Sequence, residues 1–410
     1  MIDPAEAAPD PGSESAAGFE PLWRWARRTY ALHLLTLWGL AISNACLGLS
    51  VLLSASALRG CPARLRRLAP LLPPLGLYVL LLAAAIVASP APRESFGSLS
   101  ELFALATLLL APLLVRADDF RRRLIDAVVA LGAVLALWAL GQYLVGYGDI
   151  DRRIRGPFSH WMTLAGVLLI CDLLLIARLS VDRKSRRSLW RFGALAAINL
   201  ALLGSLTRNA WVALGVTLVA FFGVRRPRSL AVLPFLALLF FLVAPLPIVS
   251  RVLSMGNPRD PSNYDRLCMI DAGLHMVAER PLFGIGPDQV QSRYALYRNP
   301  TAPRFWVPHL HNTFLQLAAE RGLPALGSYL WLMAVSIREA ARRYRREGGD
   351  AGPNAALYLG VILGLAGFNV AGLFEFNWGD TEVQRVVLFL LALPFCVAPE
   401  PEPELEPREG

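Results

Sequence analysis

The chain has 410 residues and a net charge of +9; 55% of its residues are hydrophobic and 17% are charged. Its mean hydropathy of +0.47 is far too high for an ordinary soluble protein and indicates a polytopic membrane protein. The positive charge comes almost wholly from arginine. In a membrane protein this charge sets topology, so it does not indicate a nucleic-acid partner. The five cysteines are scattered and predict neither a disulfide framework nor a thiolate metal site.

Both ends of the chain are rich in proline and acidic residues. Such segments bury too little apolar surface to fold, so we expect disordered tails at residues 1–29 and 399–410. The N-terminal segment also lacks the basic and apolar regions of a signal peptide.

Apolar segments recur from Tyr30 to Val397, and most have about the length that a helix needs to cross a hydrocarbon core of ~30 Å. Only helices satisfy their own backbone polar groups there, so we expect an all-α polytopic membrane protein with about twelve transmembrane helices. Residues 30–249 are expected to hold the first nine of these helices and residues 323–398 the last three. Tyr30–Ala57 is too long for one upright helix and is interpreted as two helices interrupted near Ile42–Ala45. The expected single spans are Leu68–Ala88, Leu99–Leu114, Leu124–Val145, Phe158–Ile176, Phe192–Leu206, Trp211–Val224, Leu230–Val249, Leu323–Val335, Ala355–Phe374 and Val383–Val397.

Arginine clusters predict the topology. If the spans alternate, the clusters all fall on one side of the membrane, which the positive-inside rule identifies as the cytoplasm. Both termini are then cytoplasmic, and the large loop at residues 250–322 lies on the opposite, periplasmic side as the single extramembrane domain. The clusters occupy residues 24–28, 59–67, 116–123, 178–187, 225–228 and 338–346.

The large loop is predicted to be mostly helical. Apolar residues recur at helical spacing between residues 263 and 280, and Pro281 ends that pattern. Asp288 is expected to cap a second helix that reaches about Tyr297. Asn312 is expected to cap a third helix, which Gly322 ends.

Two histidines precede this third helix. His311 is adjacent to the cap, where the positive end of the helix disfavours imidazolium and keeps the ring neutral, as a general base requires. His309 lies two residues earlier and is a possible cavity residue. The alternative interpretation is a pair of interfacial histidines at a membrane surface.

Two arginines occupy unusual positions. Arg208 lies at the tip of an apolar hairpin with almost no loop, where a permanent charge is expensive and commonly functional, although it can also anchor the turn by snorkelling. Arg266 lies close to the apolar face of its helix and either faces a cavity or pairs with Asp265 or Asp271. Guanidinium groups bind phosphate in a bidentate fork and need no metal to neutralise a departing diphosphate. We therefore predict a metal-free anionic site, since Asp260, Asp265 and Asp271 of the large loop are too dispersed to form a metal site.

Other polar residues lie at the outer ends of predicted spans. Arg155 and His160 lie at the outer end of one span and are possible cavity residues. Glu375 follows another and is expected to pair with one of the arginines or to hold a sugar hydroxyl. Asp380 is expected to cap the last helix.

Four segments in order resemble the O-antigen ligase and O-antigen polymerase superfamily: GPFSHWMTLAG, SLTRNAWVALG, YDRLCMIDAGLHMVAERPLFGIGPDQV and HLHNTFLQLAAERGLPALG. The resemblance implies a bacterial inner-membrane glycosyltransferase of the GT-C type without a cofactor. Its donor is a glycan on undecaprenyl diphosphate at the periplasmic face, and in ligase members the acceptor is the lipid A-core oligosaccharide. By this similarity Arg208 and Arg266 hold the diphosphate. His311 positions or deprotonates the acceptor hydroxyl for an inverting, metal-independent transfer.

Three alternatives stay open beside the ligase. The family's ligase motif commonly ends in a Thr-Arg pair, whereas LPALGS follows here, so a polymerase with a second lipid-linked glycan as acceptor is the nearest rival. Relatives that glycosylate proteins share the same frame. A lipid-linked glycan transporter is expected to carry ionisable groups in mid-membrane, whereas the unusual charges here are expected at one face, which favours a transferase.

Overall fold

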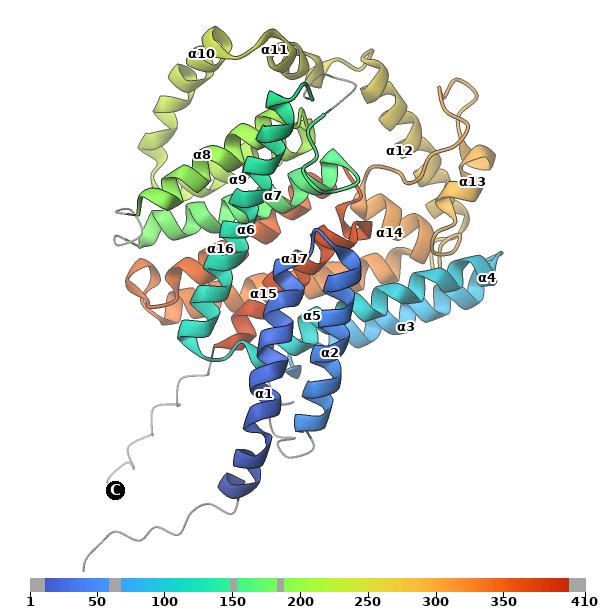
Figure 1. The fold of residues 1–410 in the computed structure, drawn as a ribbon. Coiled ribbons are helices and arrows are strands. Elements are labelled where there is room, and N and C mark those ends of the chain that lie inside the picture. The colour runs from blue at the N-terminus through green and yellow to red at the C-terminus, as the bar shows by residue number, and fades with distance from the viewer. Residues whose placement is uncertain (1–11, 59–67, 148–152, 183–187, 398–410) are drawn as a thin grey trace, which may run out of the picture.

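The computed structural model describes residues 12–58, 68–147, 153–182 and 188–397, and all regular structure among them is helical (Figure 1). The expected C-terminal tail, the arginine cluster at residues 59–67 and the second half of the cluster at residues 178–187 lie outside these ranges. The α-helices are α1 Gly12–Leu35, α2 Leu40–Leu58, α3 Leu72–Ala88, α4 Pro92–Ser95, α5 Ser100–Leu114, α6 Asp118–Leu144, α7 Trp161–Val181, α8 Leu189–Gly204, α9 Arg208–Arg225, α10 Leu233–Val243, α11 Leu246–Leu253, α12 Pro261–Glu279, α13 Val290–Tyr297, α14 Thr313–Arg321, α15 Leu323–Arg346, α16 Ala355–Gly372 and α17 Thr381–Cys396. Short 3-10 turns join them: η2 Phe96–Leu99, η4 Pro227–Val232, η5 Ser254–Gly256, η6 Gly349–Ala351 and η7 Asn377–Gly379.

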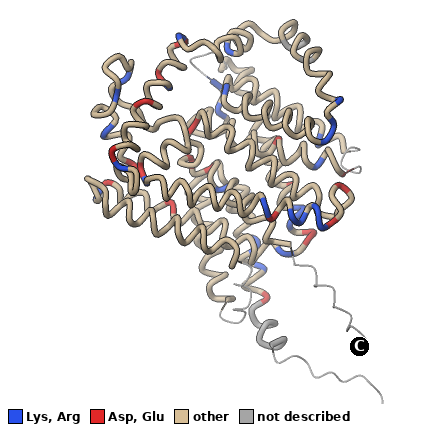
Figure 2. The backbone as a smooth tube through the Cα atoms, turned by 180° about the vertical axis from the view of Figure 1, so that it is seen from behind, with Lys and Arg blue, Asp and Glu red and all other residues tan. Residues whose placement is uncertain are grey.

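Several helices have the length and composition of membrane spans. Five segments are long and apolar enough to cross a bilayer, and α3 and α8 are shorter apolar helices. Most lysine and arginine residues lie near helix ends, and long stretches between them carry no charge (Figure 2). The chain is therefore a helical membrane protein, while the count of twelve crossings and the GT-C architecture stay predictions. The five segments are Leu40–Leu58, Pro92–Leu114, Asp118–Leu144, Trp161–Val181 and Ala355–Gly372.

Two expected boundaries differ at the N-terminal hairpin. Helix α1 begins at Gly12, so residues 12–29 are helical and not part of a disordered tail; residues 1–11 lie outside the described ranges. The break between α1 and α2 falls at residues 36–39, not near Ile42–Ala45. There the amide of Gly39 donates to the carbonyl of Thr36 at 2.9 Å, which turns the chain before α2 begins.

The expected span Leu230–Val249 is wrong as a single helix. The segment forms η4, α10 and the start of α11, and the chain breaks at Ala244 and Pro245. Pro245 has no backbone donor and its ring obstructs the preceding turn, so a continuous helix is disfavoured. Helices α10 and α11 instead form an arch at the top of the view, away from the bundle (Figure 1).

Helix α17 forms the centre of the bundle. Every side chain from Val383 to Cys396 is buried, with α17 packed along α5 and α16 packed along α7. Helices α16 and α17 approach closely because residue 364 of α16 is glycine. An added Cβ there would lie 2.4 Å from Cδ2 of Leu390. Such contacts let helix backbones pack closely in a membrane.

Ionisable groups are not confined to one face, contrary to expectation. Asp172 is fully buried within α7 and accepts a 2.9 Å hydrogen bond from Asn199 of α8. Arg385 of α17 is buried and donates to Ser43 of α2 at 2.9 Å. These polar contacts join neighbouring helices inside the bundle.

The three expected helices of the large loop are confirmed as α12, α13 and α14. Asn312 caps α14 by accepting from the amide of Leu315 at 2.9 Å. Asp288 does not cap α13: it has a positive φ of 61°, and Gln289 occupies the cap position. Gly322, with φ of 84°, separates α14 from α15, and an added Cβ there would lie 2.1 Å from the carbonyl oxygen of Leu282.

Buried contacts fix α14 on the bundle. Arg321 at the end of α14 is 1% exposed and donates to Glu101 of α5 at 2.9 Å. Its guanidinium also contacts the hydroxyl of Tyr78 on α3. The amide of Ile285 donates to the carbonyl of Ala319 at 2.8 Å, so the glycine-rich segment at residues 283–287 packs against α14.

Candidate active site

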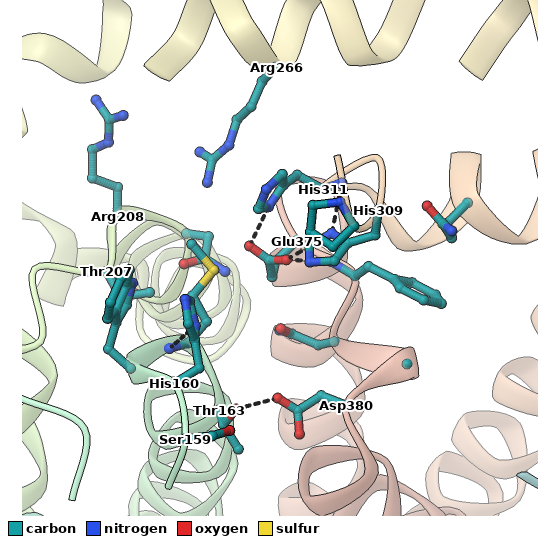
Figure 3. A pocket seen from close by; sticks show the side chains of 18 of the residues that line it. Ser159, His160, Thr163, Thr207, Arg208, Arg266, His309, His311, Glu375 and Asp380 are labelled. Atoms are coloured by element: carbon teal, nitrogen blue, oxygen red, sulfur yellow. Dashed lines mark hydrogen bonds and ion pairs between the residues drawn. The ribbon is translucent and has the colours of Figure 1, made fainter. Parts of the chain in front are cut away.

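A cavity of about 910 Å³ lies between the bundle and the large loop. The start of α7 and of α9 lines one wall, α12 crosses above, and the segment before α14 and the loop after α16 form the facing wall (Figure 3). Most of the predicted site residues meet here: Arg208, Arg266, His160, His309, His311 and Glu375. Arg155 is not among the lining residues; it is exposed and donates to the carbonyl of Ser159 at 2.9 Å.

His311 is held against Glu375. Its Nδ1 atom lies 2.8 Å from Oε2 of Glu375, and its backbone has a positive φ of 50°. A left-handed backbone is costly for a residue with a side chain and persists where the surroundings impose it. Here the neighbours are bound to the same loop: Asn312 donates to the carbonyl of Leu373 at 3.0 Å, and Thr313 donates to the carbonyl of Glu375 at 2.9 Å.

Glu375 is an ionised acceptor. It is 4% exposed, and its Oε1 atom accepts from the amide of Phe376 at 3.0 Å. Burial raises the pKa of this carboxyl, but the hydrogen bond from His311, the nearby imidazole rings and the amide of Phe376 lower it to about 2. A carboxylate that accepts the Nδ1 proton of His311 leaves Nε2 as the ring atom that can take a proton. The structure thus pairs Glu375 with histidine and not with an arginine.

His309 lies against His311, with ring centroids 4.3 Å apart. Its Nδ1 atom accepts from the amide of His311 at 3.3 Å. Burial lowers the pKa of His309 to about 4, although Glu375 opposes this shift. His309 is therefore neutral near pH 7 and supports the backbone of His311.

The donor atoms of His309, His311 and Glu375 lie within 4.8 Å of one another, as metal ligands do. The geometry fits a hydrogen bond better. Tetrahedral bonds of about 2.1 Å to one ion would separate two ligand atoms by about 3.4 Å, whereas Nδ1 of His311 and Oε2 of Glu375 are 2.8 Å apart.

Arg208 is the first residue of α9 and is 8% exposed. It donates to Oγ of Ser254 at 3.0 Å and lies 3.5 Å from Oδ1 of Asp260. The same oxygen of Asp260 caps α12 by accepting from the amide of Ser262 at 3.1 Å. This carboxylate is therefore shared between the cap and Arg208.

Arg266 points into the cavity from α12 (Figure 3). Its guanidinium has no hydrogen bond or ion pair to the described residues. The expected alternative of a pair with Asp265 is wrong, because Asp265 binds Arg304 at 3.0 Å; no pair with Asp271 is present either. Burial lowers the pKa of Arg266, an effect that Glu375 opposes and Arg208 reinforces.

His160 and Asp380 lie on opposite walls of the cavity. His160 caps α7 by accepting from the amide of Met162 at 3.2 Å, and burial lowers its pKa. Asp380 occupies the cap position of α17, but its side chain accepts from Thr163 of α7 at 2.5 Å instead of capping the helix. That contact joins the two walls at the floor of the cavity.

Comparison with known proteins matches residues 192–330 to the family model described as O-antigen ligase. This chain carries an O-antigen ligase domain. The resemblance to the O-antigen ligase and polymerase superfamily is thereby confirmed. No curated protein matches the sequence. The O-antigen ligase domain includes Arg208, Arg266, His309 and His311, whereas Glu375 reaches their cavity from outside the matched residues.

Sequence reasoning missed two arginines that line the cavity of the O-antigen ligase domain, Arg153 and Arg251. Arg153 lies over the ring of Trp161, 4.9 Å from its centroid, and takes the place expected for Arg155. Arg251 lies on α11, at the start of the large loop expected at residues 250–322, but was not singled out there. The signal available in the sequence was Pro247, which separates Arg251 from the preceding apolar run.

Proposed function

We propose that this chain is an O-antigen ligase that transfers a glycan from undecaprenyl diphosphate to the lipid A-core oligosaccharide. The observation that carries the proposal is the arrangement of one cavity, in which the Glu375–His311 pair faces Arg208 and Arg266 (Figure 3). The match to the O-antigen ligase family supports the same reaction class. A general base opposite paired guanidinium groups suits the displacement of a diphosphate.

In the proposed reaction, Nε2 of His311 accepts the proton of an acceptor hydroxyl. The hydroxyl oxygen attacks the anomeric carbon, and the bond from that carbon to the diphosphate oxygen breaks. The diphosphate leaves with the electron pair and is stabilised by Arg208 and Arg266. Attack from the face opposite the leaving group inverts the anomeric centre. Glu375 holds the ring of His311 and stabilises the imidazolium as it forms.

The proposed location is the bacterial inner membrane, with the cavity at the periplasmic face and both termini cytoplasmic. The positive-inside rule supports this orientation. Arginine clusters end α9 and α15, at residues 225–228 and 338–346. The cavity lies by the start of both α7 and α9 and by the segment before α14.

Product analysis tests the proposal. We would incubate purified protein with a lipid-linked glycan and rough-type lipopolysaccharide. Capped lipopolysaccharide is the expected product. Longer lipid-linked chains would instead identify a polymerase. This is the second candidate function, because the Thr-Arg pair typical of ligases is missing after Gly322. Glycan on neither acceptor would contradict both.

The cavity does not favour a transporter. Asp172 and Arg385 are ionisable groups inside the bundle, but neither lines the cavity. Each is hydrogen-bonded to a neighbouring helix, which is the role of a packing contact.

A further inference from the structure

Arg251 is a cation without a partner at the edge of the cavity. It projects from α11 and lines the cavity together with Arg208 and Arg266. Its Nε atom is buried and has no hydrogen-bond partner, and its guanidinium forms no ion pair with the described residues. A charged donor that is partly removed from water without an acceptor is costly, so an anionic ligand at this position would be stabilising.

The three arginines are close enough to repel one another. Burial lowers the pKa of Arg251, and Arg208 lowers it further, while Asp260 opposes the shift. Arg266 also contributes to the lowering. Like charges in one site raise the free energy of the empty protein and favour a ligand that neutralises them.

The nearby carboxylates are already engaged. Asp260 is shared by Arg208 and the cap of α12, Asp265 binds Arg304, and Glu375 binds His311. Among the described residues, none of these three carboxylates forms an ion pair with Arg251, although Asp260 opposes the lowering of its pKa. An anionic ligand would add counter-charge at this position.

Arg251 is carried by a loosely packed segment. Helix α10 packs against η4 and α11 against η5, and other described elements make only isolated contacts with either helix. Every described side chain of α10 is exposed. The far end of the arch is anchored, because Asn263 of α12 donates to the carbonyl of Ser254 at 2.9 Å. An arch held at its ends can adjust over a ligand at small cost.

We propose that Arg251 is a third ligand of the phosphoryl groups in this cavity, carried onto the bound diphosphate by the arch of α10 and α11. The inference rests on the proposed function for the identity of the donor. A diphosphate offers several charged oxygens, which suits three guanidinium forks better than two. Arg208 already donates to Ser254, whereas the buried Nε atom of Arg251 has no hydrogen-bond partner among the described residues.

Binding of farnesyl diphosphate, a soluble isoprenoid diphosphate, tests the inference with the full chain in detergent. We expect Arg251→Ala to weaken binding by about tenfold or more, and Arg251→Lys to weaken it less, because lysine keeps the charge but loses the fork. The matched control is Arg259→Ala, which removes the same charge from an exposed position outside the cavity lining. Its affinity should stay within about twofold of wild type.

Hydrogen exchange provides a second readout that uses the wild-type fold. Farnesyl diphosphate should slow amide exchange at residues 246–256 in wild type and Arg259→Ala, and should leave it unchanged in Arg251→Ala. Wild-type affinity in Arg251→Ala, or unchanged exchange in wild type with ligand bound, would overturn the inference. If Arg208→Ala still weakens binding in that case, the proposed donor site stands. Absence of binding to wild type would overturn the donor site and this inference together.

Discussion

Nδ1 of His311 and Oε2 of Glu375 lie 2.8 Å apart although the residues are 64 positions apart in the chain. The contact joins the segment before α14 to the loop after α16 and gives the proposed base a fixed tautomer. Asn312 and Thr313 donate to carbonyls of this loop, and within the loop the amide of Phe376 donates to Oε1 of Glu375, so the pair is held in place. The pair therefore belongs to the rigid part of the cavity.

Replacing Glu375 by Gln should lower the transfer rate by about 10- to 100-fold, because the amide oxygen still accepts from Nδ1 but no longer stabilises the imidazolium. Steady-state kinetics of the transfer reaction measure this effect. A full rate in the variant would mean that Glu375 serves only the fold.

Replacing Arg208 or Arg266 by Ala should reduce kcat/KM for the lipid-linked donor by about 10²- to 10³-fold, because each loses a charge-assisted contact to the leaving group. Arg155→Ala is the matched control, since Arg155 is exposed and outside the cavity lining. Transfer assays with the donor varied measure the effect. Equal losses of kcat/KM in the Arg208, Arg266 and Arg155 variants would show that the total positive charge matters, and not the positions of Arg208 and Arg266.

Acid stability should depend on His309. An unfolded histidine titrates near 6.5, whereas burial lowers the pKa of His309 to about 4 against the opposing charge of Glu375. Between these values the unfolded state binds more protons, so stability falls as the pH drops through this window. The carboxylate of Glu375 has a pKa of about 2, so its contribution to stability is lost only below this pH window.

The variant His309→Gln removes that titration. Its Tm should fall less than that of wild type between about pH 7 and pH 5, a difference of roughly 1–2 kcal/mol in stability. Thermal unfolding in detergent across this range measures it. Parallel pH curves for the two proteins would show that His309 does not titrate in this window.

Transfer should survive EDTA, because the arginines neutralise the diphosphate and the His311–Glu375 distance suits a proton better than a metal ion. The assay compares rates before and after chelation, with Mg²⁺, Mn²⁺ and Zn²⁺ added back separately. Loss of activity that one of these ions restores would replace the arginine-only mechanism with metal-assisted transfer.

Local signals in the sequence predicted much of the fold. The cap at Asn312 and the stop at Gly322 are short-range effects, and α14 has those limits. The arch was missed because the length of an apolar run does not reveal that Pro245 breaks it. Apolar length also says nothing about whether neighbouring helices cover the segment.

The candidate site was predictable residue by residue but not in its pairings. Unusual positions singled out Arg208, Arg266 and His311, and all three line the cavity. The partner of His311 depends on how α14 packs against the end of α16, which no spacing in the sequence encodes. Glu375 was accordingly expected beside an arginine.

The most direct measurement compares wild type with His311→Ala in proteoliposomes that contain lipid-linked glycan and rough-type lipopolysaccharide. We predict that wild type caps the lipopolysaccharide and releases undecaprenyl diphosphate in equal amounts. The folded His311→Ala variant should be slower by about 10²- to 10⁴-fold, as expected for loss of a general base. Transfer by His311→Ala at the wild-type rate would contradict the account.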